Sequence, residues 1–146
     1  MIEDYNGVIG IVFRRGNPDM FVLIRNQGTG NITFPAGGRE MGETSSRQTL
    51  EREIREETGL QPSEYWIIET SLIHEFIYNK RKKERKGLKA RQSVYLIETE
   101  KMDLHPEDPD SIIDGWYTSS EVIERLTFAD SKELFKKAIK FLYNYN

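Results

Sequence analysis

The feature that most constrains this chain is an acidic helix that directly follows a glycine-rich segment. Residues 50–60 read LEREIREETGL. At about 100° per residue, Glu53, Glu56 and Glu57 fall on one helix face, beside the apolar stripe that must face the core. Like charges at this spacing destabilise a helix by roughly 0.2–0.5 kcal/mol per pair, and burial raises that cost. The pattern indicates either a solvated acidic face, balanced by the neighbouring arginines, or a site where a divalent cation removes the repulsion.

The glycine-rich segment before the helix favours the cation. Gly37, Gly38 and Gly42 let the backbone turn and pass close to a ligand. A loop that leads into a helix N-terminus also suits an anion such as phosphate. The same loop carries Glu40 and Glu43, which a simple anion site does not need. A metal ion that bridges carboxylates to phosphates does need them, so we expect a metal–phosphate site built from the loop and the helix.

At these residues the chain resembles the Nudix hydrolase family. The family signature is a glycine, five residues, a glutamate, seven residues and then Arg-Glu-aliphatic-x-Glu-Glu-x-Gly-aliphatic. Gly37 and Glu43 match the first part, and residues 52–60 match the second part without a gap. Eight residues, rather than seven, separate the two parts. We interpret the extra residue as an insertion ahead of the helix; counting from Gly38 instead would place Thr44 at the glutamate position.

The resemblance implies a fold and a reaction. The fold is an α/β protein of the Nudix type, an α/β/α sandwich with a central mixed, largely antiparallel sheet, in which residues 37–60 form the loop–helix site. The reaction is a pyrophosphohydrolysis that depends on Mg²⁺ or Mn²⁺, in which water attacks phosphorus. The substrate is a nucleoside diphosphate linked to another moiety: a nucleoside triphosphate, dinucleoside polyphosphate, sugar nucleotide or capped RNA. The alternatives are a non-catalytic nucleotide sensor with a Nudix fold and an RNA-binding module.

The resemblance also implies roles for the residues of the helix. Glu56 and Glu57 would be the principal metal ligands. Glu53 would be a further ligand or the base that acts on water. Arg52 would pair with Glu43 and orient the ligands, a supporting role of the kind that tunes many metal sites.

Further ligands are expected outside the helix. The resemblance implies that a backbone carbonyl near Gly37 completes the metal shell, and that a carboxylate from elsewhere assists. Glu98 is the first candidate for that carboxylate, because it ends the same strand face as two apolar residues. The alternative is that it is a solvent-facing glutamate at a strand end. Glu75 and Glu100 are weaker candidates.

A formal net charge of −3 hides a segregation of charge. Residues 79–91 hold eight basic residues and one acidic residue, which predicts a solvated basic loop, an arm for polyphosphate or an RNA 5′ end, or a protein contact. The candidate phosphate contacts are Lys80, Arg81, Lys82, Lys83 and Arg91. Both histidines, His74 and His105, are expected to be structural.

Length and composition predict one domain over residues 1–146, and no membrane partner. The absence of cysteine, of a signal peptide and of a long apolar run favours the cytoplasm. The short N-terminal part favours a compact enzyme over a larger ADP-sugar pyrophosphatase. The expected strands cover residues 7–14, 20–25, 32–34, 65–78, 92–98 and 112–118, and the expected helices cover residues 44–58, 121–126 and 131–143.

Overall fold

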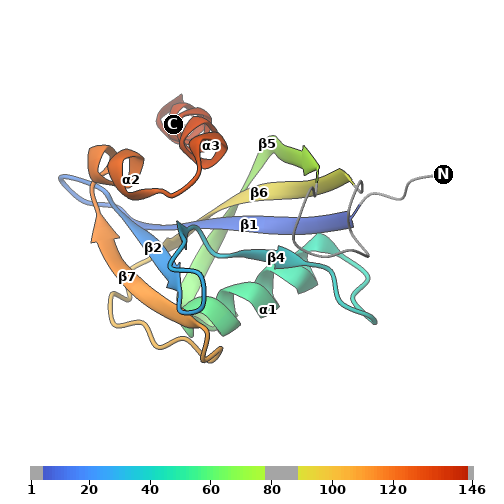
Figure 1. Ribbon diagram of the computed structural model, residues 1–146. Helices are drawn as coiled ribbons and strands as arrows, with labels where there is room; N and C mark the ends of the chain where they lie inside the picture. Colours follow the sequence, from blue (N-terminus) through green and yellow to red (C-terminus); the bar gives the residue numbers. More distant parts are fainter. Residues whose placement is uncertain (1–4, 78–88, 145–146) are drawn as a thin grey trace.

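The computed structural model describes residues 5–77 and 89–144, and Figure 1 shows their arrangement. The strands are β1 (Tyr5–Arg14), β2 (Met20–Asn26), β3 (Ile32–Thr33), β4 (Ala36–Gly38), β5 (Tyr65–Ile77), β6 (Lys89–Thr99) and β7 (Ser111–Tyr117). The helices are α1 (Ser46–Thr58), α2 (Ser119–Arg125) and α3 (Ala129–Asn144), with a short 3-10 helix at Pro62–Glu64.

The strands form a mixed sheet with the order β3-β2-β1-β6-β5. Within the described residues β1 and β6 are the only parallel pair, and the other pairings are antiparallel. Strand β4 pairs with β1, and β7 pairs with β2. The predicted mixed, largely antiparallel sheet is therefore confirmed.

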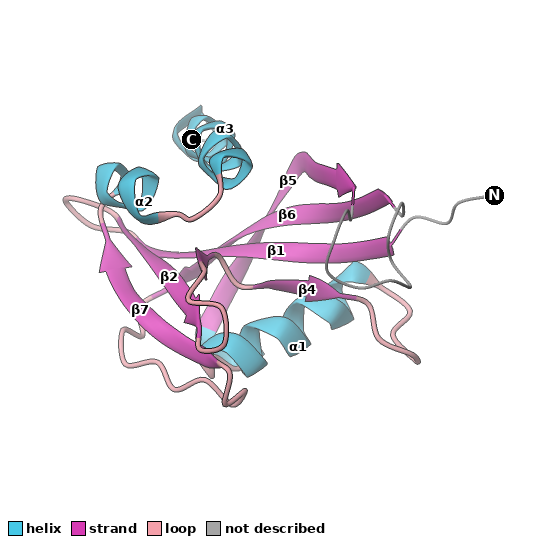
Figure 2. Ribbon diagram, in the orientation of Figure 1, coloured by secondary structure: helices cyan, strands magenta, loops and turns pink. Residues whose placement is uncertain are grey.

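The sheet lies between two layers of helices, with α1 on one face and α2 and α3 on the other (Figures 1 and 2). Strand β1 explains this arrangement, because its side chains alternate between two cores. Val8 and Val12 pack in the α1 layer, whereas Ile11 and Phe13 pack beneath α2 and α3. A strand covered on both faces has no polar face, which is why residues 7–13 lack the usual apolar–polar alternation.

Helix α1 lies close to β1 because a glycine faces it. A Cβ added at Gly10 would lie 2.6 Å from the Ile54 side chain and 3.3 Å from that of Leu50. Leu50 and Ile54 are almost fully buried, as the predicted apolar stripe required. This close packing sets the height of α1, and hence of its acidic face, above the sheet.

Two segments differ from the expected pattern. Residues 36–38, predicted as irregular, form strand β4, in which Gly37 pairs with Val8. The pairing uses backbone groups only, so a pattern of side chains cannot reveal it. Strand β6 begins at Lys89, so the last part of the predicted basic loop is strand, while residues 78–88 lie outside the described residues. None of the helices in the described residues is long and apolar enough to cross a membrane.

Candidate active site

Helix α1 has a cap at each end. The Ser45 side chain accepts a hydrogen bond from the backbone N–H of Gln48 at 3.2 Å. Gly59 ends the helix with φ of 81°, a left-handed conformation that suits glycine, and its N–H donates to the carbonyl of Arg55 at 2.9 Å. With its ends and its buried stripe fixed, α1 presents its acidic face to strand β4.

Two glutamates of α1 lie against β4. Glu53 is only 8% exposed, and its carboxyl group occupies the space where a side chain at residue 37 would stand, so an added Cβ at Gly37 would overlap it. Glu57 accepts a hydrogen bond from the backbone N–H of Ala36 at 3.3 Å. The two carboxyl groups also share a hydrogen bond with each other. A glycine at residue 37 is therefore required by the position of Glu53.

Burial sets the protonation of this pair. It raises the pKa of Glu57 to about 9, with the charge of Glu53 as the second cause. Burial also raises the pKa of Glu53, although Arg52 opposes the shift. The pair therefore retains a proton at pH 7, as two closely spaced and poorly solvated carboxyl groups do when no other positive charge separates them.

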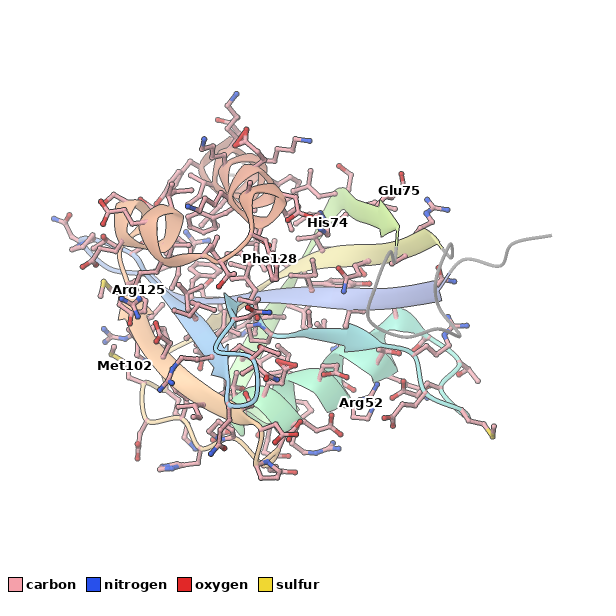
Figure 3. All side chains as sticks on the ribbon, viewed as in Figure 1. Arg52, His74, Glu75, Met102, Arg125 and Phe128 are labelled. Carbon is pink, nitrogen blue, oxygen red and sulfur yellow. The ribbon has the colours of Figure 1, made fainter. Side chains whose placement is uncertain are left out.

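Arg52 joins the loop to the helix (Figure 3). Its Nε donates to Glu43 at 2.7 Å, and its Nη2 donates to the carbonyl of Gly38 at 2.7 Å. Its Nη1 donates to Glu53 at 2.7 Å and to Glu56 at 3.1 Å. The guanidinium of Arg52 lowers the pKa of Glu43 to about 2. Arg52 therefore holds three acidic side chains in place through its own contacts.

The contacts of Arg52 also show which residue takes the glutamate position of the motif, in which eight residues rather than seven precede Arg52. Glu43 bonds to Arg52 through both carboxylate oxygens, whereas the backbone N–H of Thr44 donates to the side chain of Gln48 at 2.6 Å. Glu43, and not Thr44, is thus the partner of Arg52. The geometry agrees with an extra residue placed between Glu43 and the body of the helix.

The donors of this site fit a hard divalent cation. Glu53 and Glu57 bring a buried and a partly buried carboxyl group together at a strand whose backbone lies in contact with them. A cation would take the place of the retained proton and remove the repulsion between the carboxylates. In residues 5–77 and 89–144, no group of three or more acidic, histidine or cysteine side chains is arranged so that it could hold a metal ion. Glu56 differs from the other two in its exposure: its side chain is 34% exposed and pairs with Arg52 at 3.1 Å.

Glu98 does not join this group. Its carboxylate pairs with Arg15 at 3.0 Å, and the residue lies opposite Phe13 in the sheet, five positions along β1 from the Val8–Gly37 pair. At about 3.3 Å per residue, this places Glu98 roughly 16 Å along the strand from the acidic pair. The register of β6 against β1 decided this distance.

The remaining candidates are distributed over other parts of the molecule. Glu75 pairs with Arg91 at 3.2 Å, at the end of the β5–β6 ladder. His105 lies 3.2 Å from Asp103 in an exposed ion pair. Residues 80–83, which hold the other predicted phosphate contacts, lie outside the described residues.

A cavity of about 320 Å³ adjoins the acidic pair, with Glu57 in its wall. The other wall residues come from β1, β3, β4, β5, β6 and the start of α3. His74 is one of them, and its Nε2 lies 3.3 Å from Asp130 of α3. No sequence signal marked this cavity, because its walls come from segments far apart in the chain and from residue types that are common in cores.

The fold and the site together define an α/β/α domain with an acidic loop–helix site. The family model described as NUDIX domain matches residues 5–138. The chain therefore belongs to the Nudix hydrolase family of pyrophosphohydrolases, and the predicted family and fold are confirmed.

Solved structures share this fold. A Caenorhabditis elegans Ap4A hydrolase, solved as a binary complex, has 19% identity and a TM-score of 0.75 over 96% of this chain and 98% of its own. The NUDIX domain of Shewanella oneidensis NrtR, complexed with ADP ribose, has 16% identity and a TM-score of 0.75 over 97% and 90%. The Escherichia coli dihydroneopterin triphosphate pyrophosphohydrolase has 12% identity and a TM-score of 0.74 over 92% and 97%. At these identities the likeness shows the fold alone, and no curated protein matches the chain significantly in sequence.

Proposed function

We propose that this chain is a divalent-metal-dependent pyrophosphohydrolase that cleaves a nucleoside diphosphate linked to another moiety. The observation that carries the proposal is the close pair of carboxyl groups at Gly37, the buried Glu53 and the partly buried Glu57, in which burial raises the pKa of both. Such a pair is costly unless a positive charge is placed between its members. Mg²⁺ or Mn²⁺ is the cation that carboxylate oxygens and a phosphate ligand select.

The proposed ligands are the carboxylates of Glu53, Glu56 and Glu57, with the backbone carbonyl of Gly37. When bound, the cation would neutralise charge on the phosphate oxygens and lower the pKa of a water molecule. Arg52 acts as a positioning residue, because its Nη1 donates to Glu53 at 2.7 Å. For Glu53 the proposed role is that of a metal ligand or of the base that takes a proton from this water molecule.

The names of two relatives support this class of reaction. One is an Ap4A hydrolase and the other a dihydroneopterin triphosphate pyrophosphohydrolase, so both names denote a substrate with linked phosphates. For this chain the candidate substrates are nucleoside triphosphates, dinucleoside polyphosphates, sugar nucleotides and capped RNA. Residues 79–91 are the proposed arm for the phosphates or for an RNA end. We further propose a single domain over residues 1–146 that acts in the cytoplasm.

The test is a hydrolysis screen over these four substrate classes with Mg²⁺ and Mn²⁺, followed by substitution of one ligand. Glu57→Gln should lower kcat/KM by about 100-fold or more, because it removes a buried charged ligand. Glu51→Gln is the matched control: it lies on the same helix, its carboxylate pairs with Arg47 at 3.5 Å, and it points away from the acidic face. Equal loss in both variants would contradict the assignment.

Two alternatives remain distinguishable in the same screen. A nucleotide sensor with a Nudix fold would bind nucleotide in the presence of metal without hydrolysing any member of the panel. An RNA-binding module would bind RNA with a steep salt dependence that disappears when residues 79–91 are neutralised.

A further inference from the structure

The connection between β6 and β7 reaches the C-terminal end of α1, where Glu56 and Glu57 lie (Figure 1). The last four carbonyl groups of an α-helix have no partner within the helix, so other groups must satisfy them. In α1 these are the carbonyls of residues 55–58, and the N–H of Gly59 takes the first of them. The other three belong to the turn that carries two of the proposed metal ligands.

All three remaining carbonyls accept hydrogen bonds from segment 105–111, which ends this connection and begins β7. The pairs are the N–H groups of Glu107 and Asp108 with the carbonyl of Glu56, both at 2.9 Å, the Ser111 hydroxyl with the carbonyl of Glu57 at 3.4 Å, and the N–H of His105 with the carbonyl of Thr58 at 3.0 Å. The fit is close, since an added Cβ at Gly59 would overlap the carbonyl of His105. One segment therefore holds the whole last turn of α1.

The sequence of this segment favours a fixed shape. Residues 108–111 read DPDS, with aspartate and proline at the first two positions of a β-turn, where both are preferred. The turn closes through the N–H of Ser111, which donates to the carbonyl of Asp108 at 3.1 Å. The Asp108 carboxylate accepts from the N–H of Asp110 at 2.9 Å, and Pro109 fixes one φ angle. These restraints aim the N–H groups of the segment at α1.

The segment is also anchored to the rest of the fold. Before it, Leu104 packs in the α1 layer of the core. At its end, the carbonyl of Asp110 accepts from the N–H of Gln27 at 2.8 Å, and Ser111 pairs with Asn26 of β2. The sheet therefore sets the position of segment 105–111, and through this segment it sets the position of the last turn of α1.

We propose that segment 105–111 is a positioning element for the metal site, because it fixes the turn from which the carboxylates of Glu56 and Glu57 extend. Asp108 is its central positioning residue, since its carboxylate shapes the β-turn and its N–H holds the carbonyl of Glu56. The inference rests on the proposed function, which takes Glu56 and Glu57 as metal ligands. Groups that hold metal ligands in place typically change metal affinity by about 10–100-fold.

Asp108 could also act through its charge, because it lies close enough to Glu57 for that charge to be among the causes that raise the pKa of Glu57. Two substitutions separate the roles. Asp108→Asn keeps a side-chain oxygen that can accept from Asp110 but removes the charge, whereas Asp108→Ala removes both. A positioning role predicts that asparagine restores what alanine loses.

The first measurement is Mn²⁺ binding to the full chain without substrate, followed by electron paramagnetic resonance. Asp108→Ala should raise the Kd for Mn²⁺ about 10-fold or more, and Asp108→Asn should recover most of that loss. Ser111→Ala should have a smaller effect, because it removes one longer hydrogen bond. Asp103→Ala is the matched control: it removes an acidic residue from the same connection, but its side chain is 86% exposed and pairs with His105, so the Kd should not change.

The second measurement is amide hydrogen exchange in the metal-free protein. The N–H groups of Glu107 and Asp108 should exchange as slowly as those inside α1, although they lie outside any helix or strand. Asp108→Ala should speed the exchange of Glu107 and of the last turn of α1 by about tenfold or more, while slow exchange in β1 shows that the variant is folded.

Three results would overturn the proposal: an unchanged Kd in Asp108→Ala, an equal loss in Asp108→Asn and Asp108→Ala, or fast exchange at Glu107 in the original protein. Each of these leaves the proposed function standing, because the original protein would still bind Mn²⁺. If the original protein binds no Mn²⁺, the proposed function fails and this inference fails with it.

Discussion

Glu43 should be the side chain of the loop whose charge contributes most to stability. Its carboxylate accepts hydrogen bonds from Arg52 at 2.7 and 3.2 Å, from the Thr49 hydroxyl at 2.9 Å and from the backbone N–H of Glu40 at 2.8 Å. The side chains of Glu43 and Arg52 are only 14% and 12% exposed. Glu43→Gln keeps the shape and removes the charge, and we expect it to lower the free energy of unfolding.

The size of the effect follows from the pKa of Glu43, which Arg52 lowers from 4.5 to about 2. At about 1.4 kcal/mol for each pH unit between the unfolded and folded values, the charge contributes up to ~3 kcal/mol at pH 7. Because the folded pKa is depressed, this contribution is complete above pH 4.5 and is lost as the pH falls towards 2. By the same relation, only about 1.4 kcal/mol remains at pH 3.

The assay is urea unfolding of the original protein and Glu43→Gln at pH 7 and pH 3. The free energy of unfolding of the original protein should exceed that of Glu43→Gln by about 2–3 kcal/mol at pH 7. This difference should fall by more than half at pH 3. Glu40→Gln is the control, because Glu40 is also paired with Arg52, at 3.3 Å, but is 62% exposed; it should cost at most about 1 kcal/mol. A difference for Glu43→Gln that is small at pH 7, or independent of pH, would refute this reasoning.

Three further predictions concern the acidic helix. Gly37→Ala should displace the Glu53 carboxylate, because the new methyl group would overlap it. The variant should have a much lower kcat/KM for metal-dependent hydrolysis, whereas its free energy of unfolding should change little. An unchanged kcat/KM would contradict this. Saturating Mg²⁺ should raise the Tm of the original protein and of Glu51→Gln but not that of Glu57→Gln, as measured by thermal shift, because a ligand stabilises only the state that binds it. Ile54→Ala should cost about 2–5 kcal/mol in urea unfolding, since Ile54 is fully buried between α1 and β1; a loss below about 1 kcal/mol would show that the α1 layer repacks.

The local elements were predictable because their signals are local. The apolar stripe of α1, which includes Leu50 and Ile54, is buried as its helical spacing required. Strand β4 was not predictable in this way, since Gly37 and its neighbours have no side-chain pattern and pair through backbone groups only. The predicted contact of Arg52 with Glu43 is present at 2.7 Å. It was predictable because both residues belong to one contiguous motif.

Sites assembled from distant segments could not be predicted from such local signals. Glu98 has the residue type and strand position of a helper carboxylate, yet the register of β6 against β1 pairs it with Arg15 instead. Phe128 and Gln92 carried no signal in the chain, although they meet in one cavity beside Glu57. Both outcomes depend on which distant residues the fold brings together, and no single segment of the chain specifies this.

Helical periodicity and the spacing of one motif bring the acidic side chains together, so the sequence was enough to identify the family, the acidic helix and the candidate residues for a divalent cation. The tertiary structure alone decided how deeply Glu53 and Glu57 are buried, which raises the pKa of each. It also decided that Glu57 opens onto an apolar cavity. The physical reason is that burial and cavities arise where surfaces of several elements meet, and a free energy of desolvation exists only once those surfaces have excluded water.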